Sequence, residues 1–158
     1  MNPSAHQYTV HILVWEEAAV FARPLRETVF VHEQGVRIEE EWDEWDAVSD
    51  HAIVFGASGL AVGTGRLLPP EEPARPGEAR IGRMAVLKES RGNGAGIALL
   101  DALVALAAAR GLETLVLHAQ TQALGFYQRC GFVAEGPEFI EANIPHFTMR
   151  RVLVSPRV

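Results

Sequence analysis

The chain has 158 residues, of which 48% are hydrophobic and 22% charged, and this balance is typical of a folded domain rather than of a disordered segment. The formal net charge of −6 argues against a general nucleic-acid-binding protein, which usually carries a basic face. The one cysteine, Cys130, excludes an internal disulfide framework and a zinc cluster.

The sequence also argues against membrane insertion. The opening stretch MNPSAHQYTV lacks the charged-then-apolar pattern of a signal peptide. The longest apolar run, Ile97 to Ala109, is interrupted by Asp101 and is too short to span a bilayer. We therefore expect a cytoplasmic protein with no membrane partner. Its oligomeric state stays open, with a homodimer among the alternatives.

The first predicted elements are a strand from Tyr8 to Trp15 and a helix from Glu16 to about Glu33. Pro24 is expected to kink or divide that helix, because proline lacks a backbone donor. The next segment, Gly35 to Asp46, ends in EEEWDEWD, a charge run that is typical of a solvated loop. Its two tryptophans favour a partly folded segment that covers a pocket.

The middle of the chain is predicted to be rich in strands. His51 to Phe55 and Leu60 to Leu68 have the pattern of a strand pair, joined by a turn over residues 56–59. Pro69 to Gly77 has the composition of an exposed loop. A further strand is expected from Ala79 to Leu87.

The glycine-rich stretch RGNGAG, residues 91–96, follows that strand and leads into a predicted helix. This helix should end near Arg110, with Gly111 as its C-terminal cap. The next strand, Thr114 to Ala119, is almost continuously apolar, as in a central strand. The order strand, loop, helix, strand predicts a crossover unit whose two strands are parallel.

The last predicted elements are a short helix and two closing strands. The helix runs from Thr121, its expected N-cap, to Cys130, which we interpret as a small core residue rather than a nucleophile. Phe132–Ala134 and His146–Val154 are expected to form an antiparallel pair. The sequence thus predicts a mixed α/β sheet in a single domain, residues 1–158.

The glycine-rich loop has the chemistry of an anion-binding site. It differs from a triphosphate-binding loop, because Ile97 follows Gly96 where Lys-Ser/Thr is needed, and it lacks the third glycine of a dinucleotide fingerprint. What remains is R-x-x-G-x-G: Arg91, Gly94 and Gly96. Such a loop presents backbone N–H groups at a helix N-terminus, with room for a pyrophosphate. A tight turn without a ligand is the alternative.

This loop resembles the acyl-CoA pyrophosphate loop of the GNAT superfamily of acetyl-CoA-dependent N-acetyltransferases. VLHAQ followed by ALGFYQRCGF is similar to that superfamily's second signature. The ordered segments VFVHEQGV, EEWDEWD, DHAIV, GTGRL, IGRMAVL, AQ-x-x-A and NIPHFTM resemble the small bacterial ElaA-like subgroup. The resemblance extends from Val29 to Met149. It implies a GNAT-like fold, a mixed and mostly antiparallel sheet with a central parallel βαβ unit flanked by helices.

The same resemblance implies an N-acetyltransferase that transfers an acetyl group from acetyl-CoA to a primary amine by direct attack in a ternary complex. The residues that it implies for coenzyme A binding lie on one strand, on the glycine-rich loop and on the segment after the next strand: Met84, Ala85, Val86, Arg91, Gly92, Asn93, Gly94, Ala95, Gly96, Gln120 and Phe126.

The resemblance also implies a set of catalytic residues. Tyr127 is the implied general acid that protonates the departing thiolate, although its position in the helix fits a core tyrosine as well. Glu33, His51 and His146 match the ElaA-like pattern and are expected to surround one cleft on the acceptor side. Any of the three could be the base. The acidic segment Glu39 to Asp46 should lie near the rim and attract a protonated amine.

Two further expectations concern ligands. His118 is a fourth titratable candidate or a core histidine, and no spacing typical of a metal site is present, so we predict no metal. The acceptor should be a small-molecule or peptide amine, whose identity the sequence leaves open. The alternative function is a non-catalytic acyl-CoA-binding sensor or interaction module. A dinucleotide-dependent oxidoreductase is disfavoured, because the third glycine is missing.

Overall fold

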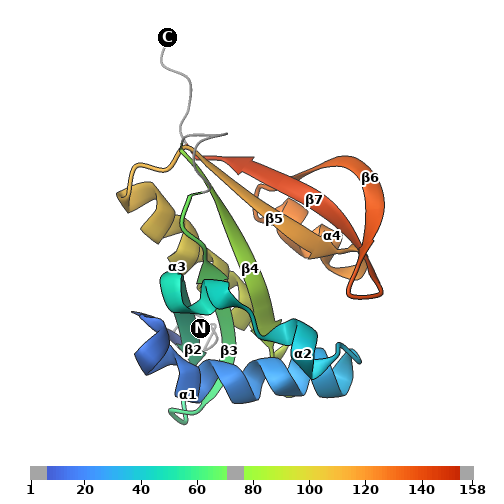
Figure 1. Ribbon diagram of the computed structural model, residues 1–158. Helices are drawn as coiled ribbons and strands as arrows, with labels where there is room; N and C mark the ends of the chain where they lie inside the picture. The colour runs from blue at the N-terminus through green and yellow to red at the C-terminus, as the bar shows by residue number, and fades with distance from the viewer. Residues whose placement is uncertain (1–6, 71–76, 154–158) are drawn as a thin grey trace.

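Seven strands form one sheet, and helices cover both of its faces (Figure 1). The computed structural model describes residues 7–70 and 77–153, and the order of its strands is β1-β2-β3-β4-β5-β7-β6. The strands are β1 (Thr9–Leu13), β2 (Asp50–Phe55), β3 (Ala61–Leu67), β4 (Glu78–Val86), β5 (Thr114–Gln120), β6 (Val133–Glu141) and β7 (Ile144–Val152). The helices and helical turns are α1 (Trp15–Arg26), η2 (Glu27–Glu33), α2 (Ile38–Glu41), η3 (Glu44–Val48), η4 (Lys88–Ser90), α3 (Ala95–Ala109), η5 (Thr121–Ala123) and α4 (Leu124–Arg129).

The sheet is split between its two central strands. β4 and β5 are parallel, as predicted, but they pair only from Glu78 opposite Thr114 to Arg80 opposite Val116. Beyond these residues β4 stays with β3 and β5 stays with β7, so the two strands part, as Figure 1 shows. The facing backbone edges of residues 81–86 and 117–120 therefore have no strand between them. The predicted fold class, a mixed and mostly antiparallel sheet with a central parallel unit, is confirmed.

A β-bulge interrupts β4 where the strands part. The register with β3 shifts between Thr64 and Arg66, and Arg83 has a positive φ of 52°. A non-glycine residue in this region is strained, and bulges re-aim the side chains that follow them. Accordingly, Ile81 packs into the core under α3, whereas Ala85 packs against η2 on the opposite face.

The helix after β1 changes type near Pro24. It is α-helical to Arg26 and π-helical from Glu27 to Glu33, so the predicted division is present. Pro24 lies inside the α-helical part and cannot donate the usual backbone bond, which favours a local change of winding. The π-helical segment ends at Glu33.

Helix α3 fills the other face of the sheet. Leu99, Leu100 and Leu103 are fully buried against it, at the spacing of one face of a helix, and Leu106 is partly buried. Ile97, on another side of the helix, is half exposed. In the described part of the chain, no helix is both long and apolar enough to cross a membrane.

Several predicted boundaries were wrong; for example, β1 ends at Leu13, and Trp15, predicted to end that strand, begins α1. Helix α4 begins only at Leu124, and the Thr121 hydroxyl donates to the Glu138 carboxylate instead of capping the helix. Strand β6 is much longer than the predicted 132–134, because a bulge with Gly136 at a φ of 75° interrupts the pattern but not the strand. In the segment Gly35 to Asp46, residues 38–41 form α2 and η3 begins at Glu44, so the segment is partly folded, as its tryptophans led us to expect. Residues 71–76 of the predicted exposed loop lie outside the described residues.

Candidate active site

A cavity of about 840 Å³ occupies the region where β4 and β5 part. Its walls come from η2, the α2–η3 segment, the second half of β4, the end of β5 with α4, and the β6–β7 hairpin. Nine of the predicted or candidate site residues line it: Glu33, Met84, Ala85, Val86, Arg91, His118, Gln120, Tyr127 and His146. The parting of the sheet thus creates the cavity and brings distant segments of the chain to it.

The glycine-rich loop lies directly after Arg91, at the N-terminus of α3. Gly92 and Gly94 have φ values of 81° and 96°, and open space surrounds the position of a side chain at each. The first turn of α3 has no capping side chain and no acidic residue, so its partial positive charge is uncompensated. This loop, which includes Asn93 and Ala95, therefore has free backbone N–H groups and space that could hold a pyrophosphate.

A different physical reason explains why position 96 is a glycine. A Cβ atom on Gly96 would lie only 3.2 Å from Cζ of Phe126. The glycine therefore allows the start of α3 to approach α4 closely. Phe126, predicted to contact coenzyme A, packs against the loop and does not line the cavity in the described structure.

Arg91 connects the loop to η2. Its guanidinium donates two hydrogen bonds to the Glu33 carboxylate, at 2.6 and 2.7 Å, and Nε donates to the Val86 carbonyl at 2.9 Å. The hydrogen bonds from Arg91 lower the pKa of Glu33. A carboxylate with a lowered pKa is a weaker base, so Glu33 is better suited to clamp the loop than to remove a proton.

Tyr127 points from α4 into the main core and the cavity wall. Its side chain packs edge-on against Phe126 and Phe132, with ring centroids 5.0 and 6.0 Å away. Burial raises the pKa of Tyr127, so its hydroxyl keeps its proton at neutral pH. Among the described residues this hydroxyl has no hydrogen-bond partner, which leaves its proton available to a ligand in the cavity.

His51 does not lie at the cavity, and the prediction that it joins Glu33 and His146 there was wrong. It is 1% exposed, its Nε2 lies 2.9 Å from the Asp46 carbonyl, and its ring packs on Trp15. Strand alternation places it on the face of β2 that α1 covers. Burial lowers the pKa of His51. Its contacts are those of a structural residue.

His146 and His118 lie together on the other side of the cavity, with Glu141 between them. Glu141 Oε1 is 3.1 Å from His118 Nδ1, and Oε2 is 3.8 Å from His146 Nε2. The hydrogen bond with His118 lowers the pKa of Glu141. Glu141 is not among the predicted site residues, because the interrupted pattern of β6 conceals the hairpin that brings residues 141 and 146 together. The signal in the sequence is Asn143, a residue type typical of hairpin turns, and in the structure both Ala142 and Asn143 have positive φ.

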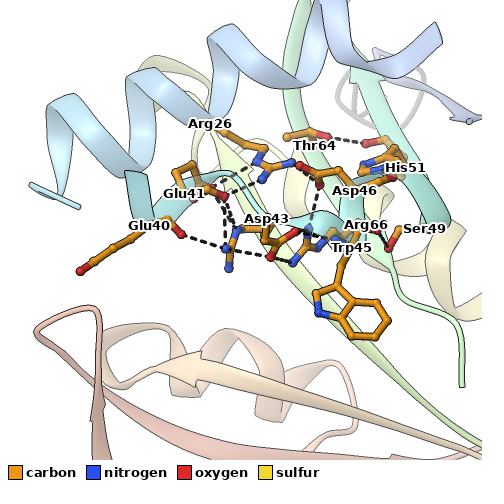
Figure 2. A network of polar contacts seen from close by, with 12 residues as sticks. Arg26, Glu40, Glu41, Asp43, Trp45, Asp46, Ser49, His51, Thr64 and Arg66 are labelled. Carbon is orange, nitrogen blue, oxygen red and sulfur yellow. Dashed lines mark hydrogen bonds and ion pairs between the residues drawn. The ribbon is translucent and has the colours of Figure 1, made fainter. Parts of the chain in front are cut away.

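The acidic segment 39–46 is only partly solvated: Glu41 and Asp46 are buried, whereas Glu39, Glu40 and Glu44 are exposed. The expectation that its tryptophans favour a partly folded segment at a pocket is confirmed, since Trp45 lines the cavity. Figure 2 shows the carboxylates of Glu41, Asp43 and Asp46 turned toward Arg26 and Arg66, whereas the Glu40 side chain points away. Arg26 donates to Glu41 at 3.2 Å and to Asp46 at 2.8 Å. Arg66 donates to both Asp43 and Asp46 at 2.7 Å. Buried carboxylates of this kind require cationic partners, which the charge run alone does not indicate.

Cation–π contacts of Arg26 and an ion pair of Arg83 complete this network. The Arg26 guanidinium lies over both Trp15 and Trp42, 5.6 and 5.1 Å from the ring centroids. Arg83, at the bulge, pairs with Glu41 at 3.1 Å. The segment does reach the cavity, through residues that include Glu40 and Trp45. Its carboxylates Glu41, Asp43 and Asp46 are paired with arginines, whereas Glu40 is exposed and lines the cavity.

Comparisons with known proteins agree with this arrangement. A family model described as an acetyltransferase (GNAT) domain matches residues 23–153. A Bacillus subtilis protein named "Uncharacterized N-acetyltransferase YjcF" is 39% identical over 137 residues, which cover 86% of this chain and 94% of that protein.

Two solved structures are also similar. An acyl-CoA N-acyltransferase from Pseudomonas aeruginosa is 31% identical, with a TM-score of 0.76, over 91% of this chain and 97% of that one. Escherichia coli ElaA is 25% identical, with a TM-score of 0.77, over 91% of this chain and 99% of that one. The split sheet, the glycine-rich loop and these matches define an N-acetyltransferase with an acyl-CoA donor. The chain belongs to the GNAT acetyltransferase family, as its motifs predict.

Proposed function

We propose that this protein transfers the acetyl group of acetyl-CoA directly to the primary amine of a small molecule or peptide while both substrates are bound. The observation that carries the proposal is that one cavity connects the unpaired edge of β4 with Tyr127 and His146. Its volume of about 840 Å³ is typical of small-molecule sites. Donor and acceptor can therefore meet inside it.

The donor side consists mainly of backbone. N–H groups of residues 92–96 would hold the pyrophosphate, and the free edge of Met84 to Val86 would pair with the pantetheine arm as an added strand does. Gln120 lines the opposite side of the gap and can bond the pantetheine amides. When bound, acetyl-CoA supplies an acetyl group whose C–S bond breaks as the amine nitrogen forms the new C–N bond.

Groups of the protein stabilise the charge that develops in the reaction and transfer the protons. A backbone N–H near Val86 would stabilise the negative charge that develops on the carbonyl oxygen. Tyr127 donates its proton to the departing sulfur and is then reprotonated by the proton that the acylated nitrogen releases. From the neutral amine the net products are an amide and a free thiol; from its ammonium form one proton is released as well.

His146 is the best candidate for the base. Glu33 is committed to Arg91, and His51 lies outside the cavity. His146 lines the cavity and is held by a contact between its Nδ1 and the Ile144 carbonyl at 2.6 Å.

The test is a thiol-release assay with acetyl-CoA and a panel of polyamines, amino sugars, amino acids and lysine peptides. Amine-dependent thiol release, with a stoichiometric acetylated product in mass spectrometry, is the expected result. Tight acetyl-CoA binding without thiol release for any of these amines would favour a non-catalytic acyl-CoA-binding module instead.

A further inference from the structure

We propose that Glu141 and His146 form the binding site for the ammonium group of the acceptor, and that His146 takes the proton that this group must lose. The inference rests on the proposed function, because it concerns the acceptor side of the same cavity. It assigns a role to Glu141 and defines the required ligand chemistry as a primary ammonium group.

The hydrogen bond of His146 fixes its tautomer. Nδ1 lies 2.6 Å from the Ile144 carbonyl oxygen, which can only accept, so Nδ1 carries the hydrogen. In the neutral ring Nε2 then has a free lone pair. Since the His146 side chain is only 8% exposed, few water molecules can compete for that lone pair.

Nε2 of neutral His146 faces a second acceptor. Glu141 Oε2 is 3.8 Å away, and neither atom has a hydrogen to give the other. A donor placed about 2.8 Å from both atoms would satisfy the two at once. An ammonium group, with three N–H donors and a positive charge, matches an imidazole lone pair beside a carboxylate.

Neighbouring side chains hold Glu141 in this orientation. His118 Nδ1 forms a hydrogen bond with Glu141 Oε1, so that Oε2 faces His146. The Phe139 ring contacts both histidines, edge-on to His118 and stacked on His146, with centroids 5.1 and 5.9 Å away. These residues come from β5, β6 and β7, and His118, Glu141 and His146 line the cavity that Tyr127 also lines.

Proton transfer in this site runs from the ammonium group to His146. The bound ammonium transfers one proton to His146 Nε2 and becomes a neutral amine with a free electron pair, and the ring becomes an imidazolium. Glu141 stabilises that imidazolium across the 3.8 Å gap. After acetyl transfer His146 returns its proton to solvent.

The first experiment needs no turnover. The protein labelled with ¹⁵N-histidine is titrated with n-butylammonium and, separately, with the neutral n-butanol. We expect only n-butylammonium to move the His146 Nε2 resonance, with an affinity about 10- to 100-fold weaker in Glu141→Gln. Glu138→Gln is the matched control, because Glu138 lies on the same strand outside the cavity lining and the amide can still accept from Thr121. Equal shifts with both probes, or an unchanged affinity in Glu141→Gln, would overturn the proposal.

The second experiment separates this inference from the proposed function. With any amine that the thiol-release assay identifies, Glu141→Gln should raise the KM for the amine about 10- to 100-fold and leave the Kd of acetyl-CoA unchanged. Normal amine kinetics in this variant would refute the Glu141 site while leaving acetyl transfer established. Conversely, n-butylammonium binding to a protein that releases no thiol would support the site and contradict the enzyme.

Discussion

Tyr127 is the residue whose environment bears most directly on its proposed role. It is nearly buried and lines the cavity, and among the described residues its hydroxyl has no partner. A tyrosine that serves only the core would usually bond its hydroxyl to a neighbouring group. The free hydroxyl therefore favours the general-acid role over the structural one.

We expect Tyr127→Phe to lower turnover by about 100- to 10,000-fold with little change in acetyl-CoA affinity, because the hydroxyl acts only as the thiolate leaves. Steady-state kinetics and calorimetry measure the two effects. Tyr8→Phe is the control: it removes the same hydroxyl from a tyrosine that packs against the core outside the cavity lining. Equal turnover in both variants would return Tyr127 to a packing role.

At the scale of elements, α3 offers a matched pair of glycines. Gly94 lies at its N-terminus and Gly111 just beyond its C-terminus, both with positive φ and both with open space around a side-chain position. An alanine at either position is strained for the same backbone reason. Only Gly94 lies on the proposed pyrophosphate loop.

We expect Gly94→Ala and Gly111→Ala to lose similar stability, about 1 kcal/mol, whereas only Gly94→Ala weakens coenzyme A binding, by tenfold or more. Urea unfolding and calorimetry give the two quantities. If both variants bind coenzyme A equally well, the loop does not hold the pyrophosphate.

The folded α2–η3 segment predicts a pH effect. Burial alone would raise the pKa of Asp43, but the hydrogen bonds and charge of Arg66 outweigh it and lower the pKa from 3.8 to about 2. A lowered carboxyl pKa adds stability that is present above the unfolded value and is lost as the pH falls toward the folded one.

Asp43→Asn should therefore be less stable than the parent at neutral pH, and this difference should shrink as the pH falls from about 4 toward 2. Urea unfolding at several pH values measures it. Asp101→Asn, on the exposed side of α3, controls for the substitution itself. A stability difference for Asp43→Asn that does not change with pH would contradict the ion pair with Arg66.

For the whole molecule, the gap between β4 and β5 limits the pairing of these two strands to residues 78–80 with 114–116. A bound pantetheine arm would bond the free edge of β4 and link the two halves of the sheet. Binding to the native state alone stabilises it by about 2.7 kcal/mol at a hundredfold excess over Kd.

We expect coenzyme A at that excess to raise Tm by about 5–10 °C and to slow amide exchange most strongly in residues 81–86. Calorimetry and hydrogen exchange test this. NAD at the same concentration is the control, since the loop lacks the third glycine of a dinucleotide site. Uniform protection over the whole sheet would indicate general stabilisation rather than an added strand.

The sequence by itself determined the family, the crossover unit and the glycine loop. These features depend on local patterns: the β-rich and apolar runs on either side of RGNGAG, and the ordered motifs from Val29 to Met149. It also brought Tyr127 and His146 forward, because the motifs that contain them, ALGFYQRCGF and NIPHFTM, resemble signatures of that family.

Only the tertiary structure decided which charged groups meet. His51 lies under α1 because successive side chains of β2 point to opposite faces of the sheet. The acidic segment folds toward the sheet because arginines from other elements, Arg26, Arg66 and Arg83, neutralise its carboxylates. Glu141 reached His146 through a hairpin whose bulge hides it in the sequence. Contacts of this kind depend on strand register and on residues far apart in the chain, so a local pattern cannot specify them.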